Sequence, residues 1–171
     1  MYSTFKTADL GFAELTLMQG NAIKTVLSED DFATARAEIH TWAGYRPTPL
    51  VSLTHLAKAL GLASVDYKDE GPRFGLGSFK ALGGAYAGLR VAARVLSEKL
   101  GREVALGELQ GDGHKAALAT ITLCSATDGN HGKSLAWGAA RIGCPCRIYI
   151  HAEVSEGRAA ALRAHGAEVI R

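Results

Sequence analysis

The sequence has little net charge and no long apolar run. Its 19 basic and 17 acidic residues leave a formal charge of +2, and the two signs are interspersed along the chain. This balance argues against a surface for nucleic acid or anionic lipid. No stretch approaches the roughly 20 apolar residues that span a bilayer, and MYSTFKTADLGF lacks the features of a signal peptide. We therefore expect a cytoplasmic protein with no nucleic-acid or membrane partner.

The sequence also lacks the residue spacings of metal and disulfide sites. Its three cysteines, Cys124, Cys144 and Cys146, are an odd number without a C-x-x-C pair, which favours reduced thiols packed in the interior. The six histidines show no H-x-x-x-H spacing. The sequence therefore gives no support for a metal site.

The second half of the chain has a regular alternation of strands and helices. From Leu118 onward, LATITLCS, CRIYIH and AEVI have the pattern of strands, and helical segments beginning at Lys133 and Ser155 separate them. This order predicts a parallel sheet with right-handed crossovers, so the fold class is α/β. The sequence stops at Arg171 directly after a strand, and we expect that the fold is cut short there.

The first half carries shorter elements. Ser28 precedes an acidic turn and is placed to cap a helix that ends before Gly44. The prolines of the segment 46–50 predict extended chain. A short helix should follow and end before Gly61, and residues 64–68 suggest a strand.

The first candidate for chemistry is a lysine that follows a glycine-rich loop, DEGPRFGLG. Ser78 is placed to cap a helix that begins near Lys80 and runs to about Leu100. The positive end of a helix disfavours an ammonium group, and the apolar Phe79 adds desolvation in the same direction. Because the neutral amine condenses with aldehydes, Lys80 is a candidate nucleophile. An ordinary surface lysine is the alternative, and the local sequence does not decide between them.

The second candidate is the loop ATDGNHG at 126–132, which lies between a strand and a helix. Parallel α/β sheets bind ligands at such loops, and the helix amino terminus suits an anionic or polar ligand. A plain turn rich in Asn, Asp and Gly is one alternative. A nucleotide-binding P-loop is another, because TDGNHGKS departs from G-x-x-x-x-G-K-[ST] only at Thr127. No later strand ends in a Mg²⁺-binding Asp, which disfavours the P-loop.

The two candidates together resemble the fold-type II pyridoxal phosphate enzymes, such as threonine and serine dehydratases. SFK at a helix start and a DGNHG loop about fifty residues later carry this resemblance. KDEGPRFGLGSFKALGGAYA and HAEVSEGRAAALRAHGAEVI, with the aspartate of the loop, are similar to the diaminopropionate ammonia-lyase family over roughly residues 45–171. The resemblance implies a three-layer α/β sandwich with a parallel sheet, like the tryptophan synthase β chain. Residues 1–79 would begin its larger domain, and residues 80–171 would form a smaller one.

The resemblance also implies a cofactor and the residues that serve it. Pyridoxal 5'-phosphate would be bound to Lys80 as a Schiff base, with Phe79 packed beside it and Asn130 hydrogen-bonded to its phenolic oxygen. Lys80 would take the Cα proton of an L-substrate and Asp128 that of a D-substrate. The family's glycine-rich phosphate loop is not found in this sequence, so we expect the chain alone to bind the cofactor weakly.

The implied reaction is α,β-elimination of 2,3-diaminopropionate, a small amino-acid substrate, to pyruvate and ammonia by a lyase that would be a homodimer at full length. Two alternatives stay open. One is a related serine or threonine dehydratase, and the other is a catalytically inactive α/β fragment that keeps the sheet alone.

Overall fold

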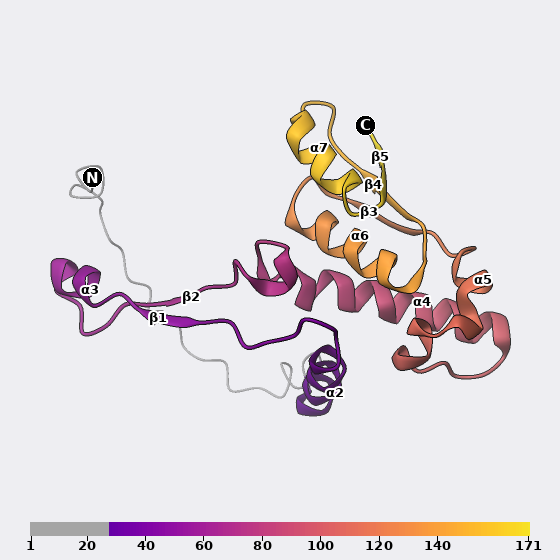
Figure 1. Cartoon of the computed structure of the whole chain (residues 1–171), viewed down its shortest axis with the longest axis horizontal. Helices are drawn as coiled ribbons and strands as arrows, with labels where there is room; N and C mark the ends of the chain where they lie inside the picture. The colour runs from indigo at the N-terminus through magenta and orange to yellow at the C-terminus, as the bar shows by residue number, and fades with distance from the viewer. Residues whose placement is uncertain (1–27) are drawn as a thin grey trace, which may run out of the picture. The chain divides into compact units, whose positions relative to one another are not determined.

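A computed structural model describes residues 28–171 of the chain (Figure 1). The pattern of contacts between residues divides the chain into two compact units, residues 1–33 and residues 34–171. The second unit contains the sheets and most of the helices. Helix α2 (Glu29–His40) runs through this division. Its amino terminus is capped as predicted, because the Ser28 Oγ accepts a hydrogen bond from the Asp31 amide at 3.0 Å.

A short antiparallel ribbon follows α2. It consists of β1 (Leu50–Ser52), helix α3 (Thr54–Leu60) and β2 (Asp66–Lys68), with the two strands paired along their length. The extended chain predicted at 46–50 continues into β1, which the sequence analysis did not predict as a strand. The short helix and its end are confirmed, because Gly61 caps α3 in the left-handed conformation at φ 67°.

The core forms around two long helices, α4 (Gly84–Leu100) and α6 (Asn130–Ile142), which pack along each other. Their backbones approach closely because small residues lie at the contact. A Cβ added to Gly138 would lie 2.8 Å from the Cβ of Ala85, and one added to Gly88 would lie 2.7 Å from a leucine of α6. Such contacts exclude larger side chains, so the glycines set the distance between the helices.

The predicted parallel sheet is confirmed, with strands in the order β3-β4-β5. The strands are β3 (Leu123–Ala126), β4 (Cys146–Tyr149) and β5 (Ala167–Ile170), and α7 (Glu156–Arg163) connects the last two. The first strand begins later than predicted, because the chain before it turns through a short helix, α5 (Lys115–Leu118).

Both crossover helices, α6 and α7, lie on one face of this sheet (Figure 1). A Cβ added to Gly132 of α6 would lie 2.8 Å from Leu162 of α7 and 3.4 Å from Ile148 of β4, so the three elements share one interior. The other face carries Arg147 and Glu168, which form an ion pair at 2.8 Å. The described residues of this unit therefore build a helical layer and a sheet layer of the α/β class.

The connection from α4 to β3 also contains two short 3₁₀ helices, η4 (Leu106–Gln110) and η5 (Asp112–His114). Their segment contributes the buried Leu109 to the core. No helix within residues 28–171 is both long and apolar enough to cross a membrane.

The three cysteines are free thiols in two kinds of environment. Cys144 and Cys146 are buried, and burial raises the pKa of each thiol to about 11. The prediction of packed thiols is confirmed for these two. It is wrong for Cys124, which is exposed because its side chain points to the face of the sheet opposite the helices.

Candidate active site

Lys80 lies in a short 3₁₀ helix, η3 (Phe79–Leu82), rather than at the start of an α-helix. Ser78 caps this turn as predicted, and its Oγ accepts a hydrogen bond from the Lys80 amide at 3.4 Å. The Lys80 carbonyl accepts from the Gly83 amide at 3.2 Å, which is the 3₁₀ pattern. The α-helix that was predicted to begin near Lys80 therefore begins four residues later, at Gly84.

The side chain of Lys80 is exposed, and its Nζ lies 4.7 Å from the centre of the Phe79 ring. The ring itself is 53% exposed. An accessible primary amine thus lies beside an accessible aromatic face, and both can contact a flat ligand that carries a carbonyl group.

A buried ionic network holds the glycine-rich loop that leads to Lys80. Arg73, in the 3₁₀ helix η2 (Arg73–Gly75), donates from Nε and Nη2 to the Glu70 carboxylate at 2.8 and 2.9 Å. It also donates to the Thr48 hydroxyl at 3.1 Å. The hydrogen bonds from Arg73 are the main reason that the pKa of Glu70 falls to about 2. The sequence analysis missed this network, although the acid and base stand three residues apart in that loop.

The same loop needs unusual backbone angles, as its glycines predicted. Gly75 and Gly77 have φ values of 71° and 78°, and Phe74 has a φ of 50°, which disfavours a residue with a side chain. The Phe74 ring packs 4.9 Å from the ring of Trp137, so tertiary contact holds it in this conformation.

The ATDGNHG loop joins β3 to α6, at the carboxyl end of the strand, as predicted. Asn130 is the first residue of α6. Two side chains of this helix reach the segment that carries Lys80: Ser134 donates to the Lys80 carbonyl at 2.7 Å, and Lys133 donates to the Leu76 carbonyl at 3.0 Å. Asn130 and Ser134 are four residues apart and share one face of the helix. The structure thus brings the two predicted motifs together.

These contacts disfavour the P-loop alternative. A P-loop uses its lysine for phosphate and its Ser or Thr hydroxyl for Mg²⁺. Here the corresponding side chains, Lys133 and Ser134, are both engaged with backbone carbonyls, and Ser134 is fully buried.

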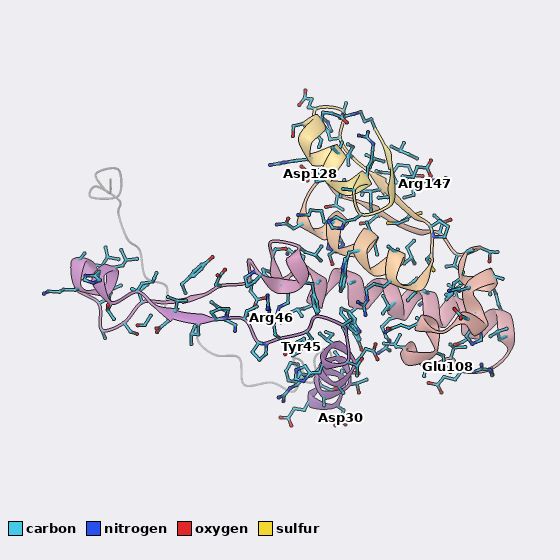
Figure 2. The ribbon with its side chains drawn as sticks, viewed as in Figure 1. Asp30, Tyr45, Arg46, Glu108, Asp128 and Arg147 are labelled. Carbon is cyan, nitrogen blue, oxygen red and sulfur yellow. The ribbon has the colours of Figure 1, made fainter. Side chains whose placement is uncertain are left out.

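Asp128 lies beside α7 (Figure 2), where its carboxylate accepts a hydrogen bond from Arg158 at 2.8 Å. The Asp128 side chain is 47% exposed. A cavity of about 380 Å³ opens here, with Asp128, Asn130, Lys133 and Arg158 in its lining. The sequence analysis missed Arg158. The parallel strand order could have predicted its position, because it puts the loops that follow β3 and β4 at the same edge of the sheet.

The four predicted site residues therefore fall into two groups on adjoining elements, Lys80 with Phe79 and Asp128 with Asn130. Among the described residues, no hydrogen bond or ion pair joins the Lys80 amine to either member of the second group. The hydrogen bonds from Ser134 and Lys133 of α6 to the backbone of the segment that carries Lys80 connect the two groups.

The chain is similar to known proteins over most of its length. Residues 41–171 match the family model for pyridoxal-phosphate dependent enzymes. Diaminopropionate ammonia-lyase of Salmonella typhimurium is 36% identical over 159 residues, which are 91% of this chain and 36% of that protein. The chain thus spans little more than a third of the length of this relative.

The crystal structure of Escherichia coli diaminopropionate ammonia-lyase in its apo form is similar, with a TM-score of 0.68 and 38% identity over 84% of this chain and 37% of that one. Its complex with an aminoacrylate-PLP azomethine reaction intermediate gives a TM-score of 0.65 at the same identity, over 84% of this chain and 34% of the other. From the matching sequence and the shared α/β fold, we conclude that this chain belongs to the pyridoxal-phosphate dependent enzyme family, in its fold-type II class.

Proposed function

We propose that this chain is part of a pyridoxal phosphate-dependent lyase that converts both enantiomers of 2,3-diaminopropionate to pyruvate and ammonia. The observation that carries the proposal is the Ser134 hydrogen bond to the Lys80 carbonyl, which joins the lysine turn to the helix that follows the DGNHG loop. The identity to diaminopropionate ammonia-lyases, 36% over 91% of this chain, supports this substrate class.

The side chains at this junction have the chemistry that the cofactor needs. The accessible amine of Lys80 would bond the aldehyde carbon, and the Phe79 ring beside it would pack on the pyridine ring. The Asn130 amide would donate a hydrogen bond to the phenolic oxygen. When bound, pyridoxal phosphate supplies a ring that accepts the electrons left at Cα after a proton is removed.

Lys80 and Asp128 are the proposed proton acceptors. The two enantiomers present their Cα–H bonds in opposite directions, so a single base cannot serve both. Once the substrate amine has replaced it on the cofactor, the free Lys80 amine would take the proton of the L-substrate, and Asp128 would take that of the D-substrate. Loss of the β-amino group and addition of one water then give pyruvate and two molecules of ammonia.

The proposal extends to the organisation of the protein. Residues 1–79 would belong to the larger domain of a fold-type II enzyme, and residues 80–171, which contain the parallel sheet, to the smaller one. We also propose that the protein is cytoplasmic and that, at full length, it forms a homodimer.

Titration of the purified chain with pyridoxal phosphate tests cofactor binding. We expect a long-wavelength absorbance band that disappears in Lys80→Ala and persists in Lys58→Ala, which removes an exposed lysine of α3. Absence of the band at saturating cofactor would contradict binding by this chain and favour the inactive α/β fragment.

Release of the 2-oxo acid tests the reaction: pyruvate from 2,3-diaminopropionate or serine, and 2-oxobutyrate from threonine. The lyase proposal expects turnover of D- and L-2,3-diaminopropionate, with Asp128→Asn losing the D-activity and keeping the L-activity. Turnover of L-serine or L-threonine alone would support the dehydratase alternative.

A further inference from the structure

A second polar site lies on α6, away from the candidate active site. Arg141 is eleven residues beyond Asn130, which corresponds to about 16 Å along the helix. Its guanidinium carbon lies 4.8 Å from the ring centre of Trp137 and 5.6 Å from that of Trp42. Two tryptophans thus hold this arginine in place by stacking.

Arg141 forms no direct ion pair within the described part of the chain. Its Nε is enclosed and has no hydrogen-bond partner within residues 28–171. Burial lowers the pKa of Arg141, although the negative charge of Glu38 acts in the opposite direction. The Glu38 carboxylate accepts a hydrogen bond from the Trp42 indole at 2.9 Å. An enclosed donor without a partner calls for a physical explanation, such as a bound ion or water.

A cavity of about 480 Å³ lies next to this group, which is within the size range of small-molecule sites. The aromatic rings of Tyr45, Phe74 and Trp137 line it, together with two arginines, Arg46 and Arg141. Figure 2 shows Tyr45 and Arg46 in the segment between α2 and β1. None of the lining residues is Asp or Glu. The cavity therefore offers positive charge and flat apolar surface together.

We propose that this cavity binds a small organic anion, whose carboxylate or phosphate group pairs with Arg141 and whose flat apolar portion packs against Phe74 and Trp137. A guanidinium can donate to two oxygens of such a group at once, and Arg141 is part of the cavity lining. The Phe74 and Trp137 rings, 4.9 Å apart, supply the apolar side. The site is separate from the proposed cofactor site, because neither Lys80 nor Asp128 lines it.

The chain contains two tryptophans, and both contact Arg141, so intrinsic tryptophan fluorescence reports directly on this site. We would titrate the chain with benzoate, with phenyl phosphate and with benzyl alcohol as the uncharged control. The proposal expects a saturable change with at least one of the two anions and none with the alcohol. The anion that binds more tightly, benzoate or phenyl phosphate, shows whether the cavity prefers a carboxylate or a phosphate group.

Variants test the role of Arg141. Arg141→Gln should weaken anion binding by roughly ten-fold or more, the effect of losing a charge-assisted hydrogen bond. Arg94→Gln removes an exposed arginine of α4 and should leave binding unchanged. If circular dichroism shows that Arg141→Gln is unfolded, Arg141→Lys replaces it as the test. Lysine keeps the positive charge but cannot donate two parallel hydrogen bonds as a guanidinium does, so this variant should also bind the anion more weakly.

Three outcomes would overturn the proposal. The first is no saturable change with either anion, which would mean that the cavity holds water alone. The second is an equal response to benzyl alcohol, which would make it an apolar cavity. The third is unchanged anion affinity in a folded Arg141 variant.

Discussion

The hydroxyl of Ser134 donates a hydrogen bond of 2.7 Å to the carbonyl oxygen of Lys80, from which it is separated by 54 positions in sequence. Gly84 lies against the same hydroxyl, and a Cβ at that position would come within 2.6 Å of it. The position of the candidate nucleophile therefore depends on a buried side chain of another helix.

Ser134→Ala should destabilise the chain by about 1 kcal/mol, because the Lys80 carbonyl loses one of its two hydrogen bonds and keeps only that from the Gly83 amide. Urea unfolding measures the change. Ser64→Ala, at an exposed position, should remain within about 0.5 kcal/mol of the parent. Equal stabilities for the two variants would show that the hydrogen bond adds nothing.

Gly138→Ala should destabilise the chain by about 1–3 kcal/mol, because the new methyl group would lie 2.9 Å from the Cα of Ala85, where backbone cannot yield easily. Gly157→Ala is the matched control on α7. No atom lies within 4 Å of an added Cβ there, so this variant should gain about 0.4–1 kcal/mol. Thermal unfolding distinguishes the expected loss of stability in Gly138→Ala from the expected gain in Gly157→Ala. Stabilisation by both changes would contradict the close packing of α4 on α6.

Glu70→Gln should destabilise the chain by about 3 kcal/mol at neutral pH, because it breaks a buried pair and leaves Arg73 uncompensated. The folded-state pKa of Glu70, about 2, is below the ordinary 4.5. The stabilisation is therefore present above pH 4.5 and is lost as the pH falls toward 2. The stability difference between parent and variant should close over that range, as measured by urea unfolding at several pH values.

Glu108→Gln is the control for this pH experiment. Arg102 lowers the pKa of Glu108 to about 2 as well, but this pair is exposed and screened by water and salt. The loss should be clearly smaller than for Glu70→Gln. A larger loss would show that burial is not what gives the Glu70 pair its strength.

Arg158→Gln should lower kcat/KM for D-2,3-diaminopropionate several-fold and leave that for the L-substrate unchanged, if Asp128 is the base for the D-form. The reason is that Arg158 orients the Asp128 carboxylate through the 2.8 Å hydrogen bond. Arg163→Gln removes another paired arginine of α7 and should change neither value. An equal loss with both substrates would assign Arg158 a general structural role instead.

A thiol reagent should label Cys124 rapidly in the folded chain and Cys144 and Cys146 slowly. Burial raises the pKa of the latter two thiols to about 11, which removes the reactive thiolate, whereas Cys124 is exposed. Mass spectrometry should find one fast adduct in the native chain, lost in Cys124→Ser, and three adducts after denaturation. Rapid labelling at several sites in the native state would contradict this burial.

The structural elements that depend on local pattern were predictable. Alternating apolar residues indicated the parallel strands, and β5 coincides with the predicted segment. The caps at Ser28 and Ser78 were also predicted, because a cap satisfies amides only a few residues away. The start of α4 was not predicted correctly, because the turn at Lys80 depends on its hydrogen bond with Ser134 of α6.

The sequence by itself therefore determined the order of elements, the α/β class and the two loops that resemble a cofactor site, because these follow from residue types at short spacing. The roles of Lys80, Phe79, Asn130 and Asp128 remain predictions. Only the tertiary structure decided which residues meet across long separations: Ser134 with the Lys80 carbonyl, and Arg158 with Asp128. The reason is that such contacts depend on which helix faces pack together, and that packing is set by many weak contacts acting at once.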